Sequence, residues 1–183
     1  RGRRSRRPVI RGTAHNPDTF FQARESANLY YTRVPDIVQR TMDRVAAIIG
    51  RSYRLFRYTG HPEAERVVIV IGSAFEVLDE TAAWLNAHGE KVGVLQVLLY
   101  RPWDAERFRA AIPPTIKAIA VLDRTKEPGG PGEPLYLDVL TTFAEAFAAR
   151  RLPAMPTIIA GRYGLSSKDF DPAMARAVFD ELK

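Results

Sequence analysis

The sequence predicts a three-layer α/β/α fold built on a largely parallel sheet. From Ala64 onward, short runs rich in Val, Ile and Leu alternate with segments of helical period. Most of these runs lack the polar alternation of a half-exposed strand, which is typical of strands covered on both faces. Strand and helix alternate four times, an order that favours helices on both sides of one sheet. The expected strands are residues 67–71, 92–99, 116–122 and 157–160.

Each expected helix begins at a recognisable signal. Ser73 and Glu76 fit a capping box, and Gly89 is expected to end that helix. Asp104 can cap a helix over residues 105–112, which precedes two prolines. The first helix has an apolar stripe of Leu78, Ala82 and Leu85.

Two further helices are expected to start at Pro134 and at Asp171-Pro172, because proline suits the first helical turn. The apolar stripe of the first is predicted to be Leu137, Leu140, Ala144 and Phe147. That of the second is Met174, Val178 and Leu182. Together with the preceding pairs, these helices complete the α/β alternation.

The first 60 residues do not follow this alternation. Residues 35–49 are predicted to form an amphipathic helix, with Val38, Met42, Val45 and Ile49 on its apolar stripe. Before it, residues 11–31 are expected to be an extended arm that leads into an aromatic-rich segment. This N-terminal part therefore differs from the α/β unit that follows.

Composition narrows the class of protein. With 183 residues, 46% of them hydrophobic, the chain can bury a core of its own, and one such domain is expected. It has no cysteine, so it can supply neither a disulfide nor a thiolate ligand. No apolar run approaches the roughly 20 residues that span a bilayer, and no signal peptide is visible. We therefore expect a cytoplasmic protein or part of one, without a membrane partner.

The net charge of +6 depends on one short segment. Residues 1–7 contain five arginines and no acid, which leaves +1 for the rest of the chain. Such an arm could bind nucleic acid or anionic lipid through phosphate contacts. No aromatic residue interrupts it and no basic stripe extends it, so a solvated terminus is favoured and nucleic-acid binding is disfavoured.

Polar loops follow the four expected strands. They are Gly72-Ser73 and residues 100–103, 123–133 and 161–170. If the strands are parallel, these loops meet at one edge of the sheet, where helix N-termini offer free N–H groups. The loops carry the cations Arg101, Arg124, Lys126, Arg162 and Lys168, and the glycines Gly129, Gly130, Gly132, Gly161 and Gly164. Arginines, lysines and exposed amides are what a phosphate or carboxylate requires.

The same loops also contain acids, which leaves two interpretations open. The acids are Asp104, Asp123, Glu127, Glu133 and Asp169. The cations are therefore either free to hold a ligand or paired, within the domain or across a domain contact. Neither the glycine pattern of a dinucleotide-binding turn nor a Gly-Lys-Ser/Thr phosphate loop is present.

No catalytic or metal-binding set of residues emerges. His15, His61 and His88 are far apart in sequence, and no pair has the spacing of metal ligands on a helix. Ser73 does not lie in a Gly-x-Ser-x-Gly turn, so it is interpreted as a helix cap and not as a nucleophile. We assign no catalytic residue and no metal ligand.

Three motifs in order resemble the pyruvate:ferredoxin (flavodoxin) oxidoreductase family. They are Arg11-Gly-Thr-Ala-His-Asn-Pro-Asp18 with Phe20-Phe-Gln-Ala-Arg-Glu25, Asp123-Arg-Thr-Lys-Glu-Pro-Gly129 with Gly132-Glu-Pro-Leu-Tyr-Leu-Asp138, and Gly161-Arg-Tyr-Gly164 with Ser167-Lys-Asp-Phe170. The likeness runs from about residue 9 to the last residue, and residues 67–99 resemble the transketolase C-terminal type of α/β domain. At Ser166, the family often has glycine, which changes the backbone freedom of that loop.

The resemblance implies an internal segment of a large, multidomain and usually dimeric enzyme. Such enzymes oxidatively decarboxylate pyruvate on thiamine diphosphate with magnesium, pass electrons through iron–sulfur clusters to ferredoxin or flavodoxin, and transfer the acetyl group to coenzyme A. Residues 1–30 would be the basic arm and the tail end of the preceding thiamine-binding domain. Residues 31–183 would be the transketolase C-terminal-like domain.

The resemblance also implies what this segment does. Lacking cluster cysteines and the acidic metal motif, it is expected to bind no cofactor and to contact other domains of the same enzyme. A phosphate- or coenzyme-binding module is the alternative. The candidate residues for a domain interface or a cofactor contact are Arg124, Thr125, Lys126, Glu127, Gly129, Gly132, Arg162, Tyr163, Gly164, Ser167 and Lys168.

Overall fold

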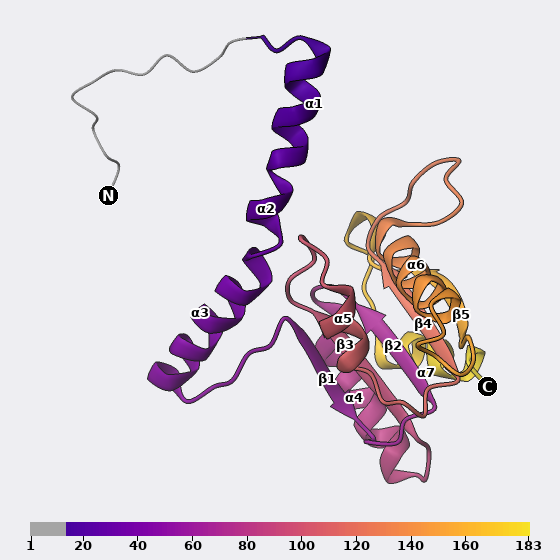
Figure 1. The fold of residues 1–183 in the computed structure, drawn as a ribbon. Coiled ribbons are helices and arrows are strands. Elements are labelled where there is room, and N and C mark those ends of the chain that lie inside the picture. The colour runs from indigo at the N-terminus through magenta and orange to yellow at the C-terminus, as the bar shows by residue number, and fades with distance from the viewer. Residues whose placement is uncertain (1–13) are drawn as a thin grey trace.

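The computed structural model describes residues 14–183, and its main body is one five-stranded sheet with helices on both sides (Figure 1). The predictions that concern residues 1–13, including the basic segment of residues 1–7, lie outside the described residues. The strands are β1 (Phe56–Gly60), β2 (Arg66–Val70), β3 (Val92–Val97), β4 (Ala118–Asp123) and β5 (Thr157–Arg162), in the order β1-β3-β2-β4-β5.

The strands β2 to β5 are parallel, as predicted. β3 and β4 flank β2, and β5 pairs with β4 at one edge of the sheet. The sequence analysis missed β1, which pairs antiparallel with β3. Gly60 and Gly93 lie opposite each other there, and a Cβ added to Gly60 would lie 2.6 Å from the Cα of Gly93. The close approach of two glycines, not an apolar run, allows this strand to pair.

Two apolar cores lie between the sheet and the helices that cover its two faces. On one face, α4 (Ala74–Ala87) and α7 (Pro172–Glu181) pack on Val68 and Val70. On the other, α5 (Ala105–Ala110) and α6 (Pro134–Ala148) pack on Val67 and Ile69. Neighbouring residues of β2 point to opposite faces and all four are buried, which explains the continuous apolar run. The predicted α/β/α fold is confirmed.

β5 departs from the expectation that every strand is covered on both faces. No residue of β5 is buried, and its first and last residues are exposed. As the edge strand beyond β4, it has a paired neighbour on one side only. A short Val- and Ile-rich run therefore does not establish burial by itself.

The helix starts are largely as predicted. Asp104 accepts the N–H of Arg107 at 3.0 Å, and Asp171 accepts the N–H of Met174 at 2.8 Å. The capping box at Ser73 is wrong, since its side chain makes no cap hydrogen bond to α4. The expected stripe of α4 is confirmed, with Leu78, Ala82 and Leu85 all buried.

The predicted stripes of α6 and α7 are partly wrong. In α6 the buried side chains are those of Leu135, Val139, Thr142, Phe143 and Ala146. Ala144 and Phe147, which were predicted to be buried, are exposed, while Leu137 and Leu140 are half-buried. In α7 the buried residues are Ala175, Phe179 and the following Leu182, whereas Met174 is exposed and Val178 half-buried. Both helices have apolar residues on more than one face, so contact with the sheet and neighbouring helices selects the buried face.

The segment before the sheet is helical and not extended, which corrects the prediction for residues 11–31 as far as they are described. It consists of α1 (Pro17–Ser26), α2 (Asn28–Tyr31) and α3 (Val34–Ile49). Asn16 caps α1 by accepting the N–H of Thr19 at 2.9 Å. The α3 helix was predicted and ends at Gly50, where φ is 71°. We call residues 17–49 the helical arm. Figure 1 shows α1 extending away from the sheet, whereas Asp36 at the start of α3 is paired with Arg107 of α5.

Candidate functional site

The four loops that follow the parallel strands meet at one edge of the sheet, as predicted. We call this set, residues 71–73, 98–104, 124–133 and 163–171, the carboxyl edge. The Nε of Arg124 donates to the carbonyl of Gly164 at 3.2 Å, and its guanidinium reaches Ser73 Oγ at 3.4 Å. The hydroxyl of Tyr163 donates to the carbonyl of Ile71 at 2.5 Å. Side chains of this one domain therefore connect three of the four loops.

Asp123 anchors the longest of these loops. Its side chain is buried, and its two oxygens accept the N–H groups of Leu135 at 3.0 Å and Tyr136 at 3.1 Å. Burial raises the pKa of Asp123, and the two backbone hydrogen bonds oppose that rise. The carboxylate thus satisfies free N–H groups at the start of α6, a role that the sequence analysis did not foresee.

Glu133 forms ion pairs with two of the predicted cations. Its side chain is 1% exposed, and Oε1 accepts from Arg162 Nε at 2.7 Å and lies 3.8 Å from Lys126 Nζ. The same oxygen accepts the N–H of Glu127 at 3.3 Å. The hydrogen bond from Arg162 is the main reason that the pKa of Glu133 lies below its usual value. Arg162 and Lys126 therefore belong to an ion-pair network within the domain.

Arg101 is also paired within the domain. It donates to Asp138 Oδ2 at 2.6 Å, and its guanidinium carbon lies 4.0 Å from the centre of the Tyr100 ring. The Tyr100 hydroxyl donates to the same carboxylate at 2.7 Å, and burial raises its pKa. Neither Tyr100 nor Asp138 was a candidate, and their sequence carries no signal of this contact. Two of the loop cations, Arg124 and Lys168, make no ion pair with a described residue.

The candidate residues separate into two groups. Three cavities of 370, 330 and 240 Å³ lie at the carboxyl edge, and all three are lined by Tyr163. Arg124 and Thr125 line the first, and Arg162, Gly164 and Lys168 line the second. Arg124, Gly164, Ser167 and Lys168 line the third. The remaining candidates, Lys126, Glu127, Gly129 and Gly132, line none of the three. The structure therefore brings seven of the eleven candidates to these cavities.

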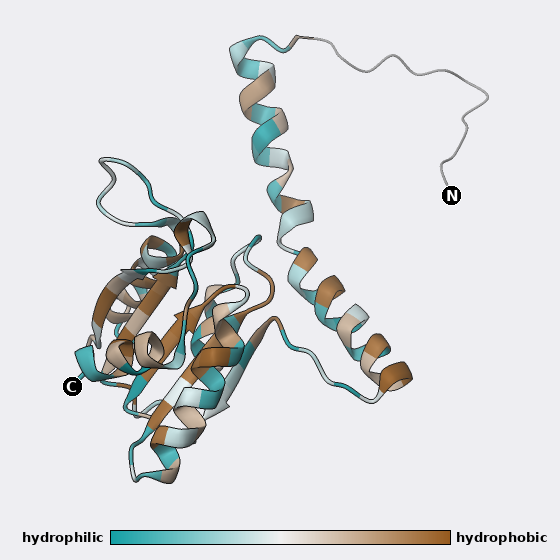
Figure 2. Cartoon of the chain, turned by 180° about the vertical axis from the view of Figure 1, so that it is seen from behind, coloured by the Kyte–Doolittle hydropathy of each residue, from teal (hydrophilic) through white to brown (hydrophobic). Residues whose placement is uncertain are grey.

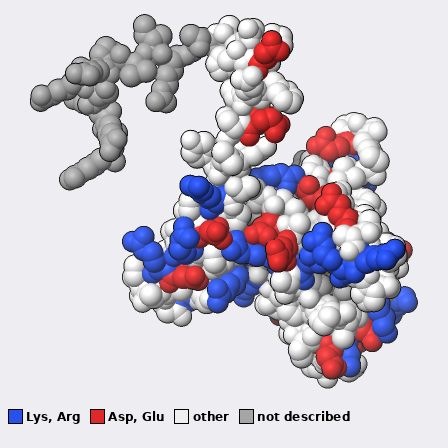
Figure 3. All heavy atoms as spheres, viewed as in Figure 1, with Lys and Arg blue, Asp and Glu red and all other residues white. Residues whose placement is uncertain are grey.

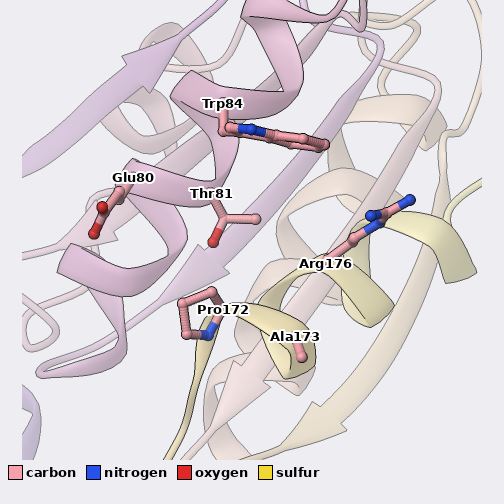
Figure 4. Close-up of a pocket in the computed structure, with 6 residues that line it drawn as sticks. All are labelled: Glu80, Thr81, Trp84, Pro172, Ala173 and Arg176. Atoms are coloured by element: carbon pink, nitrogen blue, oxygen red, sulfur yellow. The ribbon is translucent and has the colours of Figure 1, made fainter.

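A further cavity of 390 Å³ lies away from this edge, between α4 and α7 (Figure 4). The guanidinium of Arg176 is 5.6 Å from the centre of the Trp84 ring, and Thr81 and Pro172 complete the walls. Its lining is mostly apolar, as expected where two helices pack side by side. None of the sequence candidates lies in it.

In the described part of the chain we find no group of metal-binding side chains, and no basic stripe for nucleic acid on the face drawn in Figure 3. Residues 14–183 contain no group of three or more His, Asp or Glu side chains placed to hold a metal. On the face seen in Figure 3, Lys and Arg side chains are interleaved with Asp and Glu. A phosphate backbone would require a stripe of one sign. No helix among these residues has the length and apolar character needed to cross a bilayer.

The fold and this edge define a class of protein: a three-layer α/β domain with a mainly parallel sheet, whose loops are fixed by contacts within the domain. Residues 64–163 match the family model described as pyruvate:ferredoxin oxidoreductase core domain II. Because the match covers more than half of the chain, the chain belongs to this family.

Curated relatives agree with this assignment. The chain is 57% identical over 176 residues to pyruvate-flavodoxin oxidoreductase of Trichormus variabilis, covering 96% of this chain and 14% of the relative. It is 52% identical over 175 residues to pyruvate:ferredoxin oxidoreductase of Moorella thermoacetica, with the same coverage of 96% and 14%. The chain therefore spans about one seventh of the length of these relatives.

A solved structure supports the fold. The 2-oxoglutarate:ferredoxin oxidoreductase of Magnetococcus marinus, determined with 2-oxoglutarate, coenzyme A and succinyl-CoA, aligns with a TM-score of 0.53. The alignment covers 93% of this chain and 24% of that chain, at 18% sequence identity. At this identity, the similarity establishes the fold alone.

Proposed function

We propose that this chain is a structural and interface-forming domain of a pyruvate:ferredoxin (flavodoxin) oxidoreductase and is not catalytic alone. The observation that carries the proposal is the internal pairing at the carboxyl edge. Arg101 is paired with Asp138, and Arg162 with the buried Glu133, while Arg124 is hydrogen-bonded to the neighbouring loop. Cations with partners in their own domain hold loops in shape and have less charge to offer a ligand.

The complete enzyme, in this proposal, oxidatively decarboxylates pyruvate to acetyl-CoA and passes electrons to ferredoxin or flavodoxin. The chain has no cysteine to ligate its iron–sulfur clusters, and the described residues contain no group of three or more His, Asp or Glu side chains placed to hold its magnesium. Other domains would hold these groups. Residues 1–30 would then be the basic arm and the tail end of the preceding thiamine-binding domain, and residues 31–183 the α/β domain of a homodimeric, cytoplasmic enzyme.

An activity comparison tests this proposal. The full-length enzyme and this chain alone are assayed for pyruvate decarboxylation with thiamine diphosphate, magnesium, coenzyme A and an electron acceptor. We expect turnover by the full-length enzyme and none by the isolated chain. Turnover by the chain alone would contradict the structural role, and a full-length enzyme inactive on pyruvate would contradict the proposed holoenzyme.

A coenzyme- or phosphate-binding module is the second candidate. It is favoured by the 240 Å³ cavity at the carboxyl edge, where Lys168 has no ion-pair partner among the described residues. It is also favoured by the Magnetococcus structure, whose description includes bound coenzyme A. Calorimetric titration of the chain with coenzyme A, and separately with thiamine diphosphate, tests it. Heats at the dilution baseline up to about 1 mM ligand, the weak end of specific affinity, would reject this candidate.

A further inference from the structure

The helical arm, residues 17–49, exposes more large apolar side chains than the rest of the described chain. Nine of the fourteen exposed large hydrophobic residues lie in it, among them Tyr30 at 75%, Leu29 at 71% and Ile48 at 82% exposure. Neither α1 nor α2, both fully described, buries a single residue. In Figure 2 the brown, apolar bands of the arm lie mainly in α3. A soluble surface rarely keeps this many aromatic and aliphatic groups together unless they form an interface.

The apolar stripe of α3 continues beyond the surface that covers it. Its first half packs on the sheet domain, where Val38 and Met42 contact the core behind β2. Gln39 bonds to the backbone of Tyr53 and Leu55 in the same region, which fixes the helix there. The second half, Val45 and Ile49, lies on the same stripe at helical spacing and is 40% and 55% exposed. The stripe therefore has a covered half and an uncovered half.

The composition of the arm indicates what kind of surface would cover it. Four acids and four arginines cancel within residues 17–49, so the arm attracts neither an acidic nor a basic partner by net charge. Aromatic and aliphatic residues with little net charge are typical of permanent contacts. Short helices that bury nothing are also marginal by themselves, so α1 and α2 require packing against another surface.

We propose that the helical arm is the main docking element of this chain and that its apolar side packs on parts of the same polypeptide that lie outside residues 1–183. We infer that the covering surface belongs to the same polypeptide because of its length. The chain described here spans 14% of its relative, so most of such a polypeptide lies outside it and can cover the arm. A tethered surface also has a high effective concentration. This inference rests on the proposed function, but it assigns the main interface to the arm and not to the carboxyl edge.

Hydroxyl-radical footprinting of the full-length enzyme tests whether the helical arm is shielded from solvent. The rates of modification of Tyr30 and Tyr31, which are 75% and 59% exposed here, are compared in the native and the urea-unfolded enzyme. We expect native rates at least about tenfold lower, since a packed interface excludes water. Native rates within about twofold of the unfolded ones would overturn the proposal. Activity on pyruvate, measured in the same sample, shows separately whether the proposed function holds.

Cross-linking identifies the surface that packs on the helical arm. A photoreactive p-benzoylphenylalanine replaces Tyr30 in the full-length enzyme, and isotopically light and heavy subunits are mixed before assembly. Cross-links within one isotopic chain, to residues outside the domain, are expected. Cross-links that join light and heavy chains would assign the arm to a second copy and overturn the proposal. Failure to cross-link together with unprotected tyrosines would overturn it as well.

A pair of substitutions in α3 gives an independent readout. Ile49→Ser in the full-length enzyme is expected to lower its melting temperature by roughly 2 °C or more, because a covered apolar contact is lost. Arg40→Ser, at an exposed position on the opposite side of the same helix, is the matched control and should have no effect. Equal melting temperatures for the two variants would contradict a covered arm.

Discussion

At the scale of single residues, the carboxyl edge depends on Gly164, whose backbone has φ of 62°. Its carbonyl accepts from Arg124, and a Cβ at this position would lie 3.0 Å from Arg124 Nε. Gly164→Ala is therefore expected to reduce the free energy of unfolding of the domain by about 1–2 kcal/mol. Urea denaturation measures the change. Gly130→Ala is the control, since the nearest atom would be 3.4 Å away and its φ lies outside the left-handed region; an equal cost in both variants would argue against this account.

The Glu133 network predicts a dependence on pH. Because the folded-state pKa of Glu133 is lowered, the charged form favours folding, and this stability is present above the unfolded pKa and lost as pH falls through the folded one. Glu133→Gln should therefore be less stable than the parent at neutral pH. The difference in melting temperature should shrink below about pH 4, near the unperturbed pKa of glutamate. A difference that stays constant from neutral pH to acid would contradict a stabilising role for the charge.

Some residue-level features could be predicted from the sequence and others could not. The polar loops after the apolar runs indicated that cations and acids would meet at one edge. Which acid pairs with which cation depends on side-chain geometry, so the roles of Asp123 and Asp138 were not predictable. Ser166, where the family often has glycine, has φ of 51°, the region glycine favours, so its sequence position did carry a signal.

At the scale of elements, α6 offers a test of the corrected helix face. Phe143 is 2% exposed and Phe147 is 48% exposed, although the sequence stripe placed Phe147 inside. Phe143→Ala is expected to cost about 3–5 kcal/mol of unfolding free energy, the usual value for a buried phenylalanine. Phe147→Ala should cost about 0.5 kcal/mol or less in the isolated chain. Chemical denaturation of both variants measures these losses. A larger loss for Phe147→Ala than for Phe143→Ala would support the helix face predicted from the sequence.

Elements with strong periodicity were predicted and elements that depend on tertiary contact were not. The four parallel strands and α4 carry continuous apolar signals, and the structure confirms them. β1 lacks such a run because its pairing depends on the approach of Gly60 to Gly93. α1 was missed because its polar sequence has no apolar stripe, although Asn16 and Pro17 form a regular helix start.

At the scale of the whole molecule, two surfaces differ in character. At the carboxyl edge, three of the five loop cations are paired within the domain, whereas the helical arm leaves an apolar face uncovered. The sequence predicted the family and the convergence of the loops. The sequence alone could not show that more large apolar side chains are exposed on the arm than on the loops. The exposure of the arm's side chains depends on how far along α3 the helix packs on the sheet domain.

The central claim, that this domain contributes contacts and not cofactor chemistry, is tested most directly by the Michaelis constant for coenzyme A. Arg124 and Lys168 are the loop cations with no ion pair among the described residues, and Lys168 makes no side-chain hydrogen bond there either, so a coenzyme phosphate would use Lys168 first. The full-length Lys168→Ala enzyme is compared with Lys117→Ala, which removes an exposed cation before β4, at the opposite end of the strand. We predict Michaelis constants for coenzyme A within about twofold of the parent in both; a rise of about tenfold in Lys168→Ala alone, equivalent to about 1.4 kcal/mol of binding, would contradict the claim.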